Sequence, residues 1–344
     1  MWGVGMSWMK YRALIALTLL CAAGALLHGA PTVGAERSEY RRPTKIPYPD
    51  DNPFSDAKAQ LGWMLFFDPM LSGSGSHSCA TCHIPSQAWT DHLPRAVGEA
   101  KVALPLRVPT LLNVAWTPRL GWDGKFHDLE AVTFTPITSP KNMNLPEGEL
   151  IERLSAVPGY VRSFAAAFGE GGITRRHVEA ALATYERSIV SAAAPFDRWV
   201  AGDEEAIDQG AKRGFALFTG KAHCSECHSG WAFTDGSFHD IGTAQGDDIG
   251  RGRLFPSSVK LRYAFKTPTL RDVARRAPYM HDGSFATLDD VIELYDRGGI
   301  ARPSRSPVIR PLALTASEKA DLISFVHTLT SPPQPVGLPL LSHY

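Results

Sequence analysis

The spacing of apolar side chains predicts helices from residue 174 onwards. Apolar residues recur three and four positions apart after Thr174, after Asp203 and after Thr315. This spacing puts them on one face of an α-helix, and each of the three polar residues can cap a helix start. Thr315 also forms a capping box with Glu318, and Pro332 ends that helix. The predicted apolar faces are Val178, Ala181, Leu182, Tyr185 and Ile189; Ala206, Ile207, Ala211 and Phe215, running into Cys224; and Leu322, Ile323, Val326 and Leu329.

Strands are nearly missing from the pattern. No run of useful length alternates apolar and polar residues, and the 344 residues include 26 prolines and 30 glycines. Proline and glycine interrupt regular elements and favour turns. The sequence therefore predicts a mostly α-helical protein with long irregular loops.

The first 35 residues have the pattern of a secretory signal peptide. Lys10 and Arg12 precede an apolar run over 13–27, and small residues at 33–35 provide a cleavage site. The run of 15 residues is shorter than the roughly 20 that span a bilayer, with an uncleaved anchor as the alternative. Leu20 is too large for a lipoprotein signal at Cys21. We therefore expect export to the periplasm and no transmembrane span after signal removal.

Composition excludes several classes of protein. Hydrophobic residues make up 44% of the chain and charged residues 20%, which is typical of globular and not of disordered chains. The 35 basic residues balance the 35 acidic residues. The chain therefore lacks the basic excess that would indicate a nucleic-acid partner. The length is sufficient for about two domains.

All four cysteines beyond the signal peptide fall into two copies of Cys-x-x-Cys-His. The copies are Cys79, Cys82 and His83, and Cys224, Cys227 and His228. In an exported protein this pattern is typical of a covalent c-type haem, because cysteines one helical turn apart reach the two vinyl groups and the histidine ligates the iron. Disulfides within each pair and zinc sites are the alternatives, although each copy offers three ligands where structural zinc takes four.

The distance between the motifs predicts two domains. His83 and His228 lie 145 residues apart, so each haem has a domain-sized stretch of chain. We expect two cytochrome-c-like helical domains, each with one covalent haem and with the haems near a shared interface. The first would cover 36–192, and the second would cover 193–344, with a tail that packs back on the first domain. The boundary is expected within 191–202.

Four further segments accompany the haem motifs. They are 61–72, 121–124, 194–198 and 277–283, with the sequences LGWMLFFDPMLS, GWDG, APFDR and APYMHDG. With these segments, the chain from about residue 50 to 330 resembles the bacterial dihaem cytochrome c peroxidase family, in its MauG-like branch. The resemblance implies a haem-dependent oxidoreductase that reacts with H2O2 and uses its two haems differently.

In that family the sixth ligand of the second haem comes from the helix that follows the 277–283 segment. Tyr295 stands at this position, which resembles the MauG-like members and differs from the methionine-ligated peroxidases. A tyrosine ligand stabilises the ferric and higher states of the iron. The alternative is that Met280 or His281 ligates the iron and Tyr295 is a half-buried aromatic residue.

The resemblance also implies an open first haem. In the methionine-ligated peroxidases a histidine fills the peroxide position until reductive activation removes it. Glu99 stands at that place in this chain, and His92 comes too early in the loop. We therefore expect the first haem to bind peroxide without activation, with ligation by His92 as the alternative.

The peroxide pocket departs from the family pattern. The family's loop supplies a glutamate that moves a proton between the peroxide oxygens. Asn142 occupies the glutamate position, and Val132 that of an accompanying glutamine. An amide can hydrogen-bond the bound oxygen but cannot shuttle a proton. Peroxide turnover is therefore expected to be slow, unless a neighbouring group such as Glu130, Glu99 or His127 supplies the proton.

Between the haems the family places a tryptophan and commonly a calcium ion. Trp122 matches the tryptophan, which would connect the irons electronically; packing as a core aromatic is the alternative. Arg107 and Arg276 stand at two calcium-ligand positions, and a guanidinium cannot ligate Ca²⁺, which takes oxygen ligands. We therefore expect no calcium, and guanidinium groups that bind haem propionates instead.

The resemblance implies one principal activity and two alternatives. H2O2 would take one electron from each haem iron, giving a bis-Fe(IV)-like state that oxidises a tryptophan or tyrosine on an exported partner protein. Trp231 is a candidate hopping site, or it packs on the second haem. One alternative is a conventional peroxidase, which reduces H2O2 to water with electrons from a small cytochrome or copper protein. The other is a dihaem electron carrier without catalytic activity.

Overall fold

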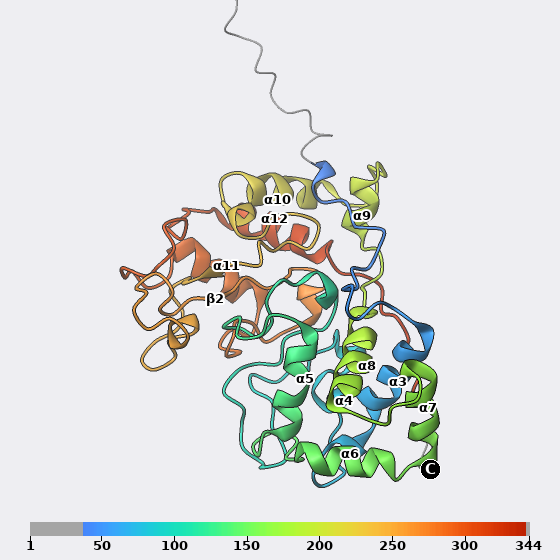
Figure 1. Ribbon diagram of the computed structural model, residues 1–344. Helices are drawn as coiled ribbons and strands as arrows, with labels where there is room; N and C mark the ends of the chain where they lie inside the picture. The colour runs from blue at the N-terminus through green and yellow to red at the C-terminus, as the bar shows by residue number, and fades with distance from the viewer. Residues whose placement is uncertain (1–36, 342–344) are drawn as a thin grey trace, which may run out of the picture. The chain divides into compact units, whose positions relative to one another are not determined.

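Two helix pairs organise the fold. In the first, α3 (Asp56–Phe67) packs along α8 (Arg175–Arg187), and in the second, α10 (Gln209–Thr219) packs along α12 (Ala316–His327) (Figure 1). The computed structural model describes residues 37–341, so the predicted signal peptide lies outside the described residues. The described residues from Tyr40 onwards form one unit that contains both pairs.

Each helix pair crosses at a glycine. A Cβ atom on Gly62 of α3 would lie 2.0 Å from the carbonyl oxygen of Ala181 in α8. A Cβ atom on Gly214 of α10 would lie 1.9 Å from the carbonyl oxygen of Asp321 in α12. Both helix backbones approach so closely that only glycine fits. Each half of the chain therefore contains a helix pair whose close approach depends on a glycine.

Further helices and one small strand pair complete the two halves. The first half adds α4 (Cys79–Cys82), α5 (Leu129–Thr138), α6 (Glu147–Ser155) and α7 (Pro158–Phe168). The second half adds α9 (Pro195–Val200), α11 (Leu288–Arg297) and an antiparallel pair of two-residue strands, β1 (Phe238–His239) and β2 (Phe265–Lys266). Irregular loops join them, as the proline and glycine content predicts.

The predicted helices after Thr174 and Thr315 are confirmed. Thr174 caps α8 by accepting from the backbone of His177, and Thr315 forms its capping box with Glu318 at the start of α12. The prediction for Asp203 is wrong, because α10 begins at Gln209 and ends at Thr219, before Cys224. Asp208 caps that helix, while Asp203 accepts from the backbone of Glu205 within a turn.

Each half has its own hydrophobic core. Leu65 and Phe66 of α3 lie with Leu182 of α8 in the first core. The second core is aromatic, and Phe196 and Phe325 pack edge to face with their ring centres 5.5 Å apart. Two separate helical cores, each beside one Cys-x-x-Cys-His motif, agree with the predicted fold of two cytochrome-c-like domains.

Contacts between residues far apart in the sequence stabilise the fold. The guanidinium of Arg271, which is fully buried, forms an ion pair with Asp197 at 2.7 Å. Near the C-terminus, the carbonyl oxygen of Gly337 accepts from the indole of Trp63 in α3 at 3.2 Å. None of the helices in the described part of the chain is both long and apolar enough to cross a membrane.

Candidate functional site

The first motif occupies one helical turn and the residue after it. Cys79 and Cys82 are the first and last residues of α4, and His83 follows as its C-cap. The Nδ1 atom of His83 lies 3.2 Å from the carbonyl oxygen of Trp89, so it donates and leaves Nε2 with a lone pair for a metal. Burial lowers the pKa of His83 to about 4, which keeps the ring in the neutral, ligating form.

The second motif repeats this arrangement. Cys224 begins a 3₁₀ turn, and the Nδ1 atom of His228 lies 2.9 Å from the carbonyl oxygen of Phe233. Burial lowers the pKa of His228 as well. The four described cysteines form no disulfide with one another, so the disulfide alternative is not realised in the structure.

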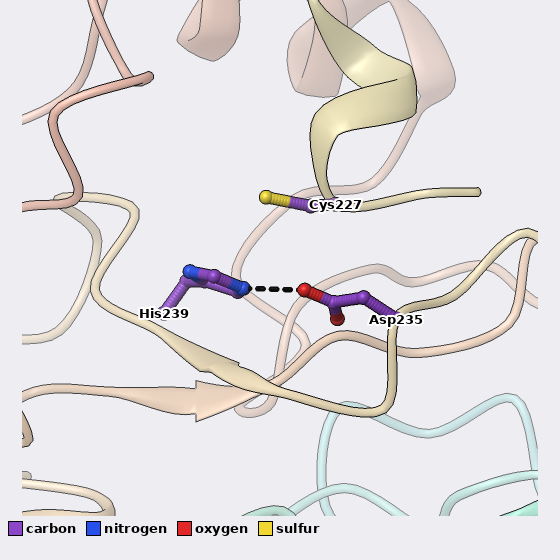
Figure 2. A group of neighbouring side chains, drawn as sticks. All are labelled: Cys227, Asp235 and His239. Atoms are coloured by element: carbon purple, nitrogen blue, oxygen red, sulfur yellow. Dashed lines mark hydrogen bonds and ion pairs between the residues drawn. The ribbon is translucent and has the colours of Figure 1, made fainter.

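One cluster near the second motif resembles a metal site. Cys227, Asp235 and His239 bring their sulfur, oxygen and nitrogen atoms within 4.8 Å of one another, and His239 bonds Asp235 at 2.7 Å (Figure 2). Three ligands are one fewer than structural zinc takes. A haem thioether would also occupy the Cys227 sulfur. What remains beside the second haem motif is then a hydrogen-bonded His239–Asp235 pair.

A cavity of about 830 Å³ opens beside the first motif, a size within the usual range for bound cofactors. Its walls come from both halves of the chain. The first half contributes Cys79, Cys82, His83, α5 and α8, and the second half contributes the stretches 265–269 and 278–280. Trp122 and Asn142 both line it. The structure therefore brings two of the three predicted catalytic residues to one cavity.

Two buried guanidinium groups also line this cavity. Arg107 donates to the carbonyl oxygens of Arg276 at 2.8 Å and Ala277 at 3.3 Å, and Arg276 donates to that of Thr269. The Nε atom of each arginine has no hydrogen-bond partner. Among the described residues, no carboxylate forms an ion pair with either arginine. These buried cations, each with an unpaired Nε atom, fit the carboxylates of a haem, as the sequence predicts.

Tyr295 lies on α11 close to the second motif. Burial raises the pKa of its phenol, and the nearby sulfur atoms of Cys224 and Cys227 raise the pKa further. A phenol in this environment ionises only when a cation such as iron binds it. The two alternative ligands lie elsewhere: Met280 lines the large cavity, and His281 bonds Asp248 at 2.8 Å and stacks on Phe265.

Trp122 is fixed by backbone groups from both halves. Its indole Nε1 atom donates to Arg107, and its carbonyl oxygen accepts from the backbone of Lys266 in β2 at 2.8 Å. Its ring also meets His281 edge to face, with 6.4 Å between the ring centres. The indole is therefore held at the cavity by contacts that leave it little freedom.

Family comparisons give these residues their context. Residues 56–205 match the family model described as di-haem cytochrome c peroxidase, and residues 211–330 match the cytochrome c model. The chain is 50% identical to the methylamine utilization protein MauG of Methylorubrum extorquens, over 95% of this chain and 97% of that protein. It is 44% identical to MauG of Methylophilus methylotrophus, over 96% and 98%.

The chain belongs to the MauG and di-haem cytochrome c peroxidase family. A solved structure of a MauG-like protein associated with microbial copper homeostasis superposes with a TM-score of 0.79 and 31% identity, covering 84% of this chain and 95% of that one. This MauG-family chain is thus a haem oxidoreductase that acts on peroxide, with two covalent c-type haems.

His92, the alternative ligand of the first haem, and Glu99, a possible proton donor, do not line the cavity in this MauG-family chain. His92 is exposed, and its Nε2 atom lies 2.8 Å from the carbonyl oxygen of Arg275. Glu99 accepts from the backbone of Ser74 at 3.0 Å, and these hydrogen bonds lower its pKa. The backbone N–H of Glu99 donates to the carbonyl oxygen of Asn142 at 2.7 Å, so this segment positions the Asn142 loop.

The other two proton donors suggested by the sequence are also elsewhere. Glu130 accepts two hydrogen bonds of 2.7 Å from Arg187, and this partner lowers its pKa despite burial. His127 is exposed beside Asp128. Neither residue lines the cavity. In the described residues, the sequence candidates therefore leave the peroxide pocket without an acid.

Trp231 packs against charged and aromatic neighbours. Its ring centre lies 4.9 Å from that of Trp116, and the guanidinium carbons of Arg42 and Arg271 lie 5.7 and 5.8 Å from it. Arg271 also donates to its carbonyl oxygen at 2.7 Å. Cation–π contacts stabilise the neutral ring. They disfavour the positive charge that a hopping site carries.

Proposed function

We propose that this protein uses H2O2 to oxidise a tryptophan or tyrosine residue on an exported partner protein. The observation that carries the proposal is the phenol of Tyr295 beside the Cys224 and Cys227 sulfur atoms. When bound, the two haems supply the iron centres that give up two electrons to peroxide. A tyrosine at the second haem favours retention of that oxidising power over its immediate discharge.

The residues have distinct roles in this proposal. Cys79 and Cys82 attach the first haem and Cys224 and Cys227 the second, with His83 and His228 as the respective iron ligands. Tyr295 completes the second iron's coordination. Trp122 connects the haems electronically, because it is held between the halves of the chain. Asn142 hydrogen-bonds peroxide in the first pocket.

The partner is an exported protein. Two relatives that match nearly the whole chain, at 50% and 44% identity, are named for methylamine utilization. We place the oxidised partner in the same process. The proposal includes export by the signal peptide at 1–35, work in the periplasm, and division of the mature chain into 36–192 and 193–344.

One titration tests the proposal. The fully ferric protein receives one equivalent of H2O2 without reductant, and optical and EPR spectra are recorded. The expected result is that both haems leave the ferric state together and stay so until a partner is added. If only half-reduced protein reacts, the protein is a conventional peroxidase. If neither state reacts, it is an electron carrier.

A further inference from the structure

A carboxyl group that the sequence patterns did not single out lines the peroxide cavity. Glu186 lies on α8, four residues after the buried Leu182, so both point to the same side of the helix. Leu182 and Glu186 line the cavity that Cys79 and Asn142 also line. A glutamate on the apolar side of a core helix is out of place unless the cavity gives it a function.

Burial keeps the Glu186 carboxyl largely protonated at neutral pH. Burial raises its pKa to about 8, and the negative charge of Glu130 acts in the same direction. Arg187 opposes this shift, but its guanidinium already binds both oxygens of Glu130. Cys79 and Tyr185 are titratable neighbours of Glu186, and Cys79 loses its proton permanently once the haem thioether forms. Lys266 also lines the cavity, and burial lowers its pKa to about 8, so the Glu186→Gln profile is what separates the two groups.

The other carboxylates that line the cavity either accept hydrogen bonds from other residues or are exposed. Asp123 accepts from the backbone of Lys125 at 3.1 Å, Asp248 bonds His281, and Asp247 is exposed. Among the described carboxyl groups lining the cavity, Glu186 is thus the one that combines access to the first haem motif with a raised pKa.

We propose that Glu186 is the proton-transfer group for peroxide cleavage in the first haem pocket, in the role that Asn142 cannot fill. The inference rests on the proposed function only in requiring that H2O2 react in this pocket. The Asn142 side chain would then orient the peroxide, and the acid would come from α8.

The proton and electron balance is simple. The Glu186 carboxyl gives its proton to the oxygen that leaves as water when the O–O bond breaks, and takes a proton back from the other oxygen. The two electrons come from the haem pair. The second oxygen becomes water after two protons from solvent and two electrons from the oxidised partner have followed.

The test is the stopped-flow rate of the haem-loaded protein with H2O2, measured from pH 6 to 10 for Glu186→Gln. General acid–base groups contribute about 10²–10⁴-fold, so the expected loss at pH 7 is at least about 100-fold. In the wild type the rate should fall as pH rises through about 8, because the protonated carboxyl is the active form. The variant should lack this inflection.

Three further variants make the result decisive. Glu179→Gln, on the same helix but away from the cavity, should keep both the rate and the pH profile. Glu186→Asp should regain part of the rate, and Asn142→Glu in the Glu186→Gln background should restore it. An unchanged rate and pH profile in Glu186→Gln would overturn the proposal.

The outcome is separable from that of the proposed function. If the wild type consumes peroxide quickly with the Glu186-dependent profile yet never oxidises a partner, the proposed function fails and the assignment of Glu186 stands. If Glu186→Gln fails to load haem, the pH profiles of Glu186→Asp and of Asn142→Glu decide the matter alone. Both must then differ from the wild-type profile.

Discussion

The indole of Trp122 donates a hydrogen bond of 2.9 Å to the carbonyl oxygen of Arg107. Arg107 in turn donates through its guanidinium to the carbonyl oxygen of Arg276 in the other half of the chain. The residue proposed to connect the haems is therefore tied to the buried cations that fit their carboxylates. A substitution of Trp122 or Arg107 should therefore change the properties of both haems.

Replacement of Trp122 by phenylalanine should uncouple the haems without unfolding the protein. Phenylalanine keeps an aromatic ring, although a smaller one, and the lost hydrogen bond costs about 1 kcal/mol. We expect both haems to remain attached, while the spectral change at the second haem after H2O2 addition lags behind that at the first. Trp63→Phe, on α3, is the control. Simultaneous changes in Trp122→Phe would refute the relay role.

Replacement of Tyr295 by phenylalanine should abolish partner oxidation. Loss of outer groups around a metal ligand costs about 10–100-fold, so loss of the ligand itself should cost at least about 100-fold. The EPR spectrum of the second haem should change, and that of the first should not. Tyr263→Phe, whose hydroxyl bonds a loop carbonyl, should behave as the wild type. Normal partner oxidation by Tyr295→Phe would show that another side chain ligates the iron.

Replacement of Arg107 by glutamine should lower the reduction potential of the haem in the large cavity, because a positive charge beside a haem favours its reduced state. A hydrogen bond to a charged group contributes about 1.5–3 kcal/mol, which corresponds to about 60–130 mV for one electron. Spectroelectrochemical titration measures the shift, with the exposed Arg119→Gln as control.

Removal of divalent cations should have no effect on the protein. The guanidinium groups of Arg107 and Arg276 already provide positive charge at the cavity, so EGTA should leave the haem spectra and the peroxide reaction unchanged. A loss of activity that added Ca²⁺ restores would show that a calcium ion binds in spite of the two arginines.

Replacement of Gly214 by alanine should destabilise the second half of the chain. The new methyl group would collide with the backbone of Asp321, and overpacking of this kind costs about 1–3 kcal/mol or more. Gly148→Ala, in α6 with open space around it, should be neutral or stabilising. Thermal unfolding of the haem-loaded protein, followed by circular dichroism, compares the two variants.

Local patterns predicted the features that depend on neighbouring residues. Both haem motifs, the Thr174 cap and the Thr315 capping box are short-range, and the structure contains each of them. The predicted start of α10 at Asp203 was wrong because Asp203 and Asp208 are equally good helix caps in the sequence. Only the turn that follows α9 decides between them.

Long-range contacts could not be predicted in this way. Nothing near Gly62 in the sequence indicates that the backbone of Ala181 will contact it. Glu186 can be recognised as a candidate only from the cavity that it lines, to which both halves of the chain contribute. One signal was available, since a glutamate four residues after Leu182 interrupts the apolar face of α8. In our proposal, this interruption supplies the carboxyl group for proton transfer in the cavity.

The two guanidinium groups beside Trp231 have a consequence for self-damage. A ring flanked by fixed positive charges resists one-electron oxidation, because its radical cation would be a third positive charge in the same place. The two guanidinium groups therefore make oxidation of Trp231 harder, and the Asp197 carboxylate that pairs with both offsets part of this effect. An enzyme that stores oxidising equivalents while it waits for a partner needs such protection for its own tryptophans.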